Sequence, residues 1–108
     1  MVVETDTVTF AWTPAYDVTQ TNVLDYDLQV ATSTDFDADS IVLTVEDIPD
    51  AVDLVEYEAD ITQLPSGRLY YRVIARGDTD PARVWQVAEN RLRTAGTTFY
   101  GMVEFDIP

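Results

Sequence analysis

Apolar and polar side chains alternate along most of this chain, and a period of two residues is typical of β-strands that bury one face. In residues 7–12 the side chains of Val8, Phe10 and Trp12 fall on one face, and Pro14 ends the run. Further alternating or apolar runs predict strands at residues 25–30, 41–45, 55–61, 69–76, 84–93 and 98–107. Turn-forming residues separate the runs, and no helical period extends over three turns. The pattern therefore predicts an all-β chain.

The apolar faces of these strands define the predicted core. Its members are Val8, Phe10, Trp12, Tyr26, Leu28, Val30, Tyr57, Ile61, Leu69, Tyr71, Val73 and Trp85. With 108 residues, the chain is long enough to bury one core without disulfides or metals. We therefore expect a single domain over residues 1–108, a two-sheet sandwich of about seven strands plus an extra C-terminal strand.

Three stretches resemble a fibronectin type III or closely related immunoglobulin-like domain. They are residues 8–12, residues 26–33 followed by Phe36, and residues 64–75. In that family the first stretch corresponds to an early strand with a buried Trp, here Trp12. The second corresponds to the third strand, and the third to the strand of the corner Tyr. The resemblance covers residues 6–94 and implies an immunoglobulin-like sandwich.

Two features depart from the family pattern. Counting from Gly67 makes Tyr70 the corner residue, whereas strand alternation directs Tyr71 into the core, so both registers remain open. The chain also continues beyond the family's last strand, and residues 97–107 predict an additional strand. This strand either completes the sandwich or pairs with a neighbouring chain.

The charge balance narrows the choice of partners. The chain carries 20 acidic residues, 14 of them Asp, against six Arg and no Lys, which gives a formal net charge of -14. Such an excess repels nucleic-acid phosphates and anionic membrane surfaces, so neither is an expected partner. No apolar window is long enough to insert into a membrane. The composition resembles that of proteins from salt-loving organisms, and an ordinary acidic extracellular domain is the alternative.

Several classes of enzyme chemistry need residues that the chain lacks. Without His or Cys it has neither a His-based triad nor a thiolate nucleophile. Without Lys it has no Schiff-base nucleophile. Its carboxylates alternate along strands as they do on a solvated face, which does not indicate a pair of catalytic acids. We therefore expect a non-enzymatic protein without a cofactor, and Ca²⁺ is the alternative for which the sequence holds a candidate site.

The candidate calcium ligands are four acidic residues. Asp35, Asp37, Asp39 and Glu46 fall at positions 1, 3, 5 and 12 of an EF-hand-type loop, and carboxylate oxygens at that spacing suit Ca²⁺. However, Ser40 occupies the position where the loop needs Gly, and a strand rather than a helix is predicted to follow. A solvated acidic loop is the alternative.

Two further surface sites are candidates. Arg76, Gly77 and Asp78 form a tripeptide that fibronectin type III domains can display for integrin binding, and the alternative is a tight turn. In the additional C-terminal strand, Tyr100 and Met102 are expected to face outward with Glu104 as an interface with neighbouring subunits, because exposed Tyr and Met are typical of interfaces.

The expected function is structural. The starting Met without a secretory signal, the sandwich and the additional strand fit a capsid- or tail-associated virion protein of a virus with a salt-loving host. Its partners would be protein neighbours in an assembly or further copies of the chain. The alternative is a module of a larger cell-surface or secreted adhesin, and a calcium- or carbohydrate-binding module is a third class.

Salt should stabilise this protein. Like charges repel one another at a net charge of -14, and the repulsion destabilises the compact state unless ions screen it. The Debye length falls from roughly 30 Å at 0.01 M salt to roughly 3 Å at 1 M. We expect the melting temperature to rise steeply from dilute buffer to molar KCl. Equal midpoints in the two solutions would contradict the halophile interpretation.

Overall fold

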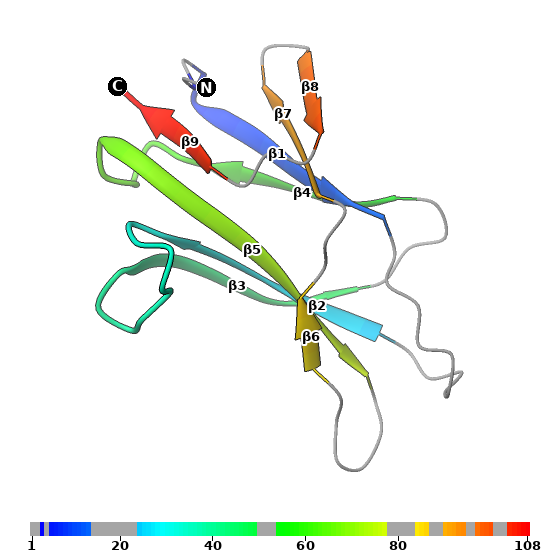
Figure 1. Cartoon of the computed structure of the whole chain (residues 1–108). Coiled ribbons are helices and arrows are strands. Elements are labelled where there is room, and N and C mark those ends of the chain that lie inside the picture. Colours follow the sequence, from blue (N-terminus) through cyan, green and yellow to red (C-terminus); the bar gives the residue numbers. More distant parts are fainter. Residues whose placement is uncertain are drawn as a thin grey trace.

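The computed structural model describes residues 3, 5–13, 24–49, 54–77, 84–86, 90–94, 97–100 and 104–108. These residues form nine strands and no helix (Figure 1). The strands are β1 (Thr7–Trp12), β2 (Leu24–Ala31), β3 (Ile41–Pro49), β4 (Val55–Asp60), β5 (Gly67–Gly77), β6 (Val84–Gln86), β7 (Asn90–Thr94), β8 (Thr97–Tyr100) and β9 (Glu104–Ile107). The predicted all-β class is confirmed.

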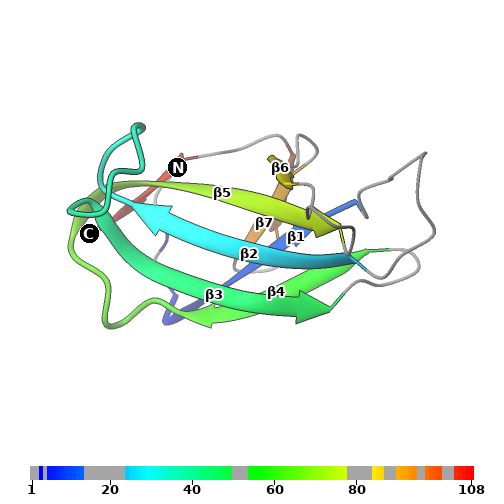
Figure 2. The ribbon, with the colours of Figure 1, turned by 90° about the horizontal axis from the view of Figure 1, so that it is seen from below.

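The strands form two antiparallel sheets that face each other, as the two views in Figures 1 and 2 show. Sheet A has the order β3-β2-β5-β6, and β9 also pairs with β5. Sheet B has the order β4-β1-β7-β8. The predicted two-sheet sandwich is therefore confirmed, and the arrangement is compatible with an immunoglobulin-like fold.

The inward faces of both sheets fill the core as the alternation predicts. Among the predicted core residues, those on β1, β2 and β5 are buried, as is Ile61, whereas Tyr57 is only partly buried against the core. The side chain of Trp85 lies outside the described residues. The structure adds residues to the core that the pattern did not single out: Val3, Ile48, Val55, Ala59, Leu92 and Phe105.

The structure shows which face of β5 points into the core. Tyr71 is 2% exposed, and Leu69, Val73 and Ala75 on the same face are buried, whereas Tyr70 is half-buried on the other face. Alternation therefore predicts this strand correctly, and counting from Gly67 does not. Burial raises the pKa of the Tyr71 phenol well above its ordinary value.

Two long predicted strands are each divided in the structure. The pattern predicts one strand over residues 84–93, but the chain forms β6 in sheet A and then β7 in sheet B. It predicts another over residues 98–107, but β8 lies in sheet B and β9 in sheet A. Both predictions of a continuous strand are wrong. A period of two is the same in either sheet, so it does not reveal where the chain crosses between them.

Strand β5 provides one edge for two of these short strands. β9 pairs with its residues 67–70 and β6 with its residues 74–76, while β2 occupies the opposite edge. Between these two pairings the chain leaves sheet A and forms the hairpin of β7 and β8 beside β1. The last strand of the chain therefore pairs within its own domain.

Phe105 on β9 completes the core. Its side chain is fully buried, and its ring centroid lies 5.9 Å from that of Phe10 and 6.3 Å from that of Tyr71. The rings of Phe10 and Tyr71 are in turn 4.8 Å apart in an edge-to-face arrangement, which is favourable for aromatic pairs. These contacts join β1 of sheet B to β5 and β9 of sheet A.

Replacing Phe105 with Ala should destabilise the domain strongly. The substitution leaves a cavity between the two sheets, and such losses cost about 3–5 kcal/mol of unfolding free energy. Urea denaturation would measure the loss. Tyr100→Ala serves as the control, because Tyr100 is 72% exposed, and we expect it to change the free energy by no more than about 1 kcal/mol, the size of its contact with Arg91. Similar values for the two variants would show that Phe105 is not part of the core.

Candidate functional site

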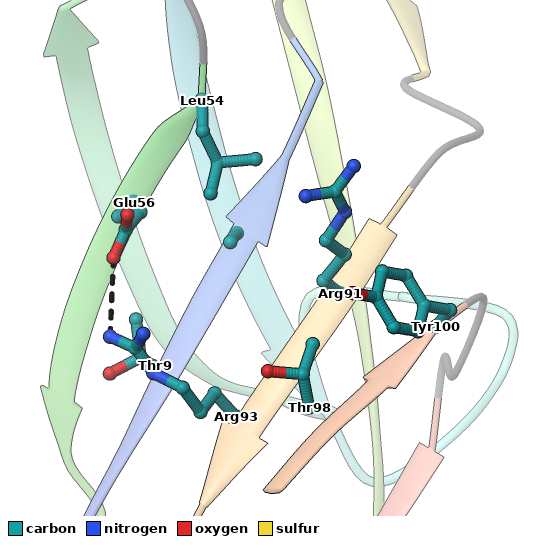
Figure 3. Close-up of a pocket in the computed structure, with 8 residues that line it drawn as sticks. Thr9, Leu54, Glu56, Arg91, Arg93, Thr98 and Tyr100 are labelled. Carbon is teal, nitrogen blue, oxygen red and sulfur yellow. Dashed lines mark hydrogen bonds and ion pairs between the residues drawn. The ribbon is translucent and has the colours of Figure 1, made fainter. Parts of the chain in front are cut away.

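The outer face of sheet B carries a shallow pocket of about 80 Å³ (Figure 3). Side chains from β1, β4, β7 and β8 line it, together with the residue before β4: Thr9, Ala11, Leu54, Glu56, Arg91, Arg93, Thr98 and Tyr100. Cavities that enclose drug-sized ligands measure roughly 300–1,000 Å³. This pocket is therefore of a size for one small side chain or a few water molecules.

Two rows of residues cross this face from one edge of the sheet to the other. The strand register gives the rows Glu56–Ala11–Arg91–Tyr100 and Glu58–Thr9–Arg93–Thr98. Each row begins with a carboxylate on β4, continues through a small residue on β1 and an arginine on β7, and ends on β8. The face is thus acidic at one edge and basic towards the other.

Tyr100 is the most exposed aromatic side chain for which the structure describes burial. It is 72% exposed at the edge of sheet B, and the guanidinium carbon of Arg91 lies 5.2 Å from the centroid of its ring. A cation over an aromatic face is attracted by the ring quadrupole, by about 0.5–1 kcal/mol at exposed sites. The contact keeps a guanidinium and a large apolar ring together at the surface.

Arg93 makes the second charged contact of this face. Its Nη2 donates a hydrogen bond to Oε2 of Glu56 at 3.3 Å, which spans the intervening strand β1 (Figure 3). Both side chains are about half exposed, so the pair adds only about 0–1 kcal/mol to stability. The buried Thr9 and Ala11 lie on the strand that this pair crosses.

The sequence interpretation missed both arginines of this face. The signal was present in the alternation Arg91-Leu92-Arg93, where a buried Leu92 directs its two neighbours to the opposite side of the strand. The alternation predicts residues 84–93 as one strand. It does not show which strands lie beside the two arginines, so it does not identify this face.

The three predicted interface residues do not lie on one strand. Tyr100 lies at the end of β8 in sheet B, whereas Glu104 begins β9 in sheet A, and Met102 lies outside the described residues. Glu104 is half-buried, and its Oε1 is 3.7 Å from Nη1 of Arg68. The structure thus places Tyr100 and Glu104 on different sheets.

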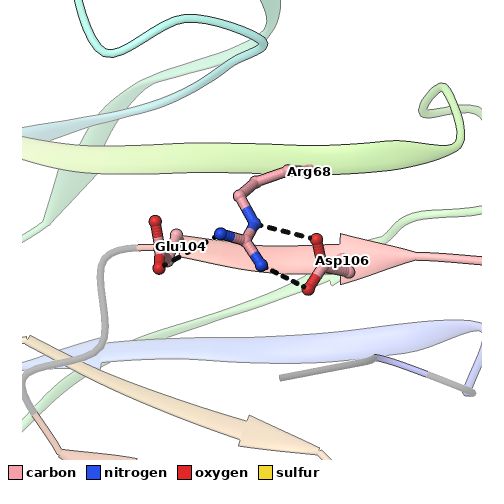
Figure 4. A network of polar contacts seen from close by, with 3 residues as sticks. All are labelled: Arg68, Glu104 and Asp106. Atoms are coloured by element: carbon pink, nitrogen blue, oxygen red, sulfur yellow. Dashed lines mark hydrogen bonds and ion pairs between the residues drawn. The ribbon is translucent and has the colours of Figure 1, made fainter.

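Arg68 connects β9 to β5 on the outside of sheet A. Its Nε donates to Oδ1 of Asp106 at 3.0 Å and its Nη2 to Oδ2 at 3.3 Å, with Glu104 on the other side of the guanidinium (Figure 4). These hydrogen bonds hold the pKa of the Asp106 carboxyl below its usual range. The contact supports the pairing of β9 with β5 and is a structural feature of this face.

The structure places the candidate calcium ligands in two different elements. Asp35, Asp37 and Asp39 are exposed in the loop after β2, and Glu46 is exposed on β3. The backbone N–H and hydroxyl of Ser40 both donate to the carbonyl oxygen of Asp37, at 2.9 Å each. Within the described ranges, no three acidic residues are grouped so that they could hold a metal ion.

The candidate adhesive tripeptide begins inside a strand. Arg76 lies on β5, and its Nε donates to Oδ2 of Asp27 at 2.7 Å while its Nη2 is 2.6 Å from the same oxygen. Gly77 ends β5, and Asp78 lies outside the described residues. The guanidinium of Arg76 is therefore engaged within its own sheet.

Asp27 is a buried carboxylate in the middle of sheet A, with only 4% of its surface exposed. Besides Arg76, it accepts a hydrogen bond on Oδ1 from the backbone N–H of Asp47 at 3.3 Å. Asp47 has a positive φ of 58° and lies where the register of β2 and β3 shifts, which allows β3 to continue to Pro49. The pattern ended this strand at Val45 because it did not anticipate a β-bulge.

Comparison of the chain with protein-family models, with curated proteins and with solved structures found no match. In the described residues there is no helix that is long and apolar enough to cross a membrane. Functional inference therefore depends on the fold and on the surface chemistry of the two sheets.

Removing the charge of Asp27 should destabilise sheet A. Asp27→Asn weakens the hydrogen bonds to Arg76 and to the bulge at Asp47, and hydrogen bonds to charged groups contribute about 1.5–3 kcal/mol. We expect a loss of that order in the free energy of unfolding, measured by urea denaturation. Asp39→Asn makes the same charge change in an exposed loop and should leave stability unchanged within about 0.5 kcal/mol. Equal effects of the two substitutions would contradict the role assigned to Asp27.

Proposed function

We propose that this protein is a non-enzymatic structural module that binds protein neighbours in an assembly. The observation that carries this proposal is the outer face of sheet B, where the exposed Tyr100 stands beside Arg91 at the edge of the sheet. Tyr and Arg are enriched in protein interfaces, where they provide much of the binding energy. The small pocket beside them is of a size for a side chain from a partner.

We further propose that the domain is related to fibronectin type III and other immunoglobulin-like modules. In that architecture one sheet has the order A-B-E-D and the other contains C, F and G. The pairing of β1 with β4 corresponds to B with E, and the pairing of β2 with β5 corresponds to C with F. The position beside B that strand A fills in the family is filled here by β7. The buried Trp12 on β1 also supports the relationship, whereas the burial of Tyr71 in place of Tyr70 departs from the family's spacing.

The assembly that best fits these features is a virion from a salt-loving host. A net charge of -14 without Lys supports the saline setting, because salt screens the repulsion between the carboxylates. A compact sandwich with an exposed, partly basic face supports a role on a capsid or tail, where the domain contacts neighbours of complementary charge.

Analysis of purified virus particles tests this proposal. We expect mass spectrometry to find the protein in particles at a constant ratio to the major capsid protein. A Tyr100→Ala variant, supplied in place of the wild type, should be incorporated poorly, whereas Asp39→Asn should be incorporated normally. Recovery of the protein only from the cell-surface fraction would contradict the virion proposal and favour an adhesin module.

A further inference from the structure

The two edge strands of sheet B, β8 and β4, differ in charge. Within the described residues no strand pairs with the outer side of β8 or with the outer side of β4. Strand β8 contains no charged residue, and β4 carries Glu56, Glu58 and Asp60, all exposed. Edge strands in stable monomers are usually protected by short length, charges, bulges or Pro. β8 is short, with four residues, but it has no charge, bulge or Pro. Its free edge is therefore suited to accept another strand.

We propose that copies of this chain associate head to tail, with β8 of one copy adding to β4 of the next. This proposal rests on the structural role proposed above. It identifies the partner of sheet B as a second copy of the same chain. Every strand of sheet B is antiparallel to its neighbours, so β8 runs opposite to β4. A second copy in the same orientation therefore presents β4 antiparallel to β8. The joined sheets form one continuous antiparallel sheet, as in β-strand addition.

The register of the sheet also continues across this junction. The row Glu56–Ala11–Arg91–Tyr100 extends to Glu56 of the next copy, and the row Glu58–Thr9–Arg93–Thr98 extends to Glu58 of the next copy. Inward- and outward-facing residues keep their alternation in this register, so neither strand has to turn its core face towards water.

The charges of the two edges match across one intervening strand, as they do within one copy, where the contact runs diagonally from Arg93 in one row to Glu56 in the other. Within one copy Arg93 on β7 reaches Glu56 on β4 across the single strand β1, with 3.3 Å between the two groups. Across the junction, Arg91 on β7 is separated from β4 of the next copy by the single strand β8. Two strand spacings amount to about 9.6 Å in each case. Arg91, which contacts the ring of Tyr100, is thus placed to pair with Glu56 of the next copy.

Charge disfavours the two symmetric pairings of these edges. Two β4 edges would place Glu56, Glu58 and Asp60 opposite the same acids, and like charges directly opposite destabilise a strand pair. Hydrogen bonds from Thr62 hold the pKa of Asp60 below its usual range. Two β8 edges would form a junction without any charge pair, because β8 carries no charged residue and the arginines of both copies would have no carboxylate across it. The mixed pairing is the complementary one.

A head-to-tail contact leaves one free edge at each end, so further copies can add and the product is an open chain or a ring. The net charge of -14 on each copy opposes this growth at low ionic strength. At about 0.15 M salt the Debye length is roughly 8 Å, so repulsion between whole copies is largely screened while groups in contact still attract. Association should therefore be weakest in dilute buffer.

Sedimentation of the purified full chain at about 0.15 M salt tests the junction. We expect the wild type to form multiples of 12.1 kDa as its concentration rises. Thr98→Asp adds a carboxylate opposite Glu58 of the next copy, and Glu58→Arg adds a guanidinium beside Arg93 of the previous copy. Each variant alone should stay monomeric. An equimolar mixture should regain association, because β8 of the Glu58→Arg copy and β4 of the Thr98→Asp copy are unchanged and can form the original junction. At the other junction the new carboxylate faces the new guanidinium.

Two controls separate these effects from general changes in charge. Asp39→Arg makes an acid-to-arginine change in the loop after β2, and Thr44→Asp adds an acid to β3 of sheet A. Both side chains are exposed and distant in sequence from the two edges, so both variants should associate like the wild type. Circular dichroism and melting curves show whether each variant folds, and the regained association of the mixture is itself evidence that both do.

Three results would overturn the proposed junction. They are a wild type that stays monomeric at every concentration, association that survives Thr98→Asp or Glu58→Arg, and a mixture of the two that stays monomeric. A monomeric chain that is nevertheless found in virus particles would refute the junction and leave the proposed function standing. A chain that self-associates through these edges but is absent from particles would refute the virion proposal instead.

Discussion

The contact among the rings of Phe10, Tyr71 and Phe105 is the interaction on which this sandwich depends. Phe10 belongs to sheet B, whereas Tyr71 and Phe105 belong to sheet A, so the three rings bury apolar area from both layers at once. The pairing of β9 with β5 brings Phe105 to this position. The passage of the C-terminal segment from sheet B to sheet A therefore adds Phe105 to the core. It leaves β8 at the edge of sheet B, where none of the described strands pairs with its outer side.

The arginines on the described strands are distributed so that each contacts a carboxylate, an amide oxygen or an aromatic ring. All six arginines lie between residues 68 and 93, whereas 15 of the 20 acids precede residue 68. Strands β5 and β7 carry the five arginines on described strands, and their neighbours in the sheets supply the partners. The contacts are Arg68 with Asp106, Arg72 with Gln29 and the ring of Phe36, Arg76 with Asp27, Arg91 with Tyr100, and Arg93 with Glu56. Cross-strand attraction thus offsets part of the repulsion in an acidic chain.

Strand alternation predicted the fold class and most of the core, because burying one face of a strand imposes a period of two wherever the strand lies. It placed Tyr71 inside and Tyr100 outside correctly. It did not locate the crossings between sheets in residues 84–107, because each sheet imposes the same period. It also missed the bulge at Asp47, where a single unpaired residue with positive φ extends β3. The motif at residues 76–78 stays a prediction, and alternation did not indicate that strand pairing brings Arg76 to Asp27.

The position of Phe105 also affects how the protein can fold during its synthesis. Strand β1 is made first, but its core face gains the ring of Phe105 only when residues 104–107 have been added. Domains fold as units, and pairing between segments far apart in sequence is slow because the intervening loop must close first. Until β9 forms, part of the β5 edge and the rings of Phe10 and Tyr71 stay accessible to water. In a nascent chain this sandwich therefore remains incompletely folded until residues 104–107 have left the ribosome.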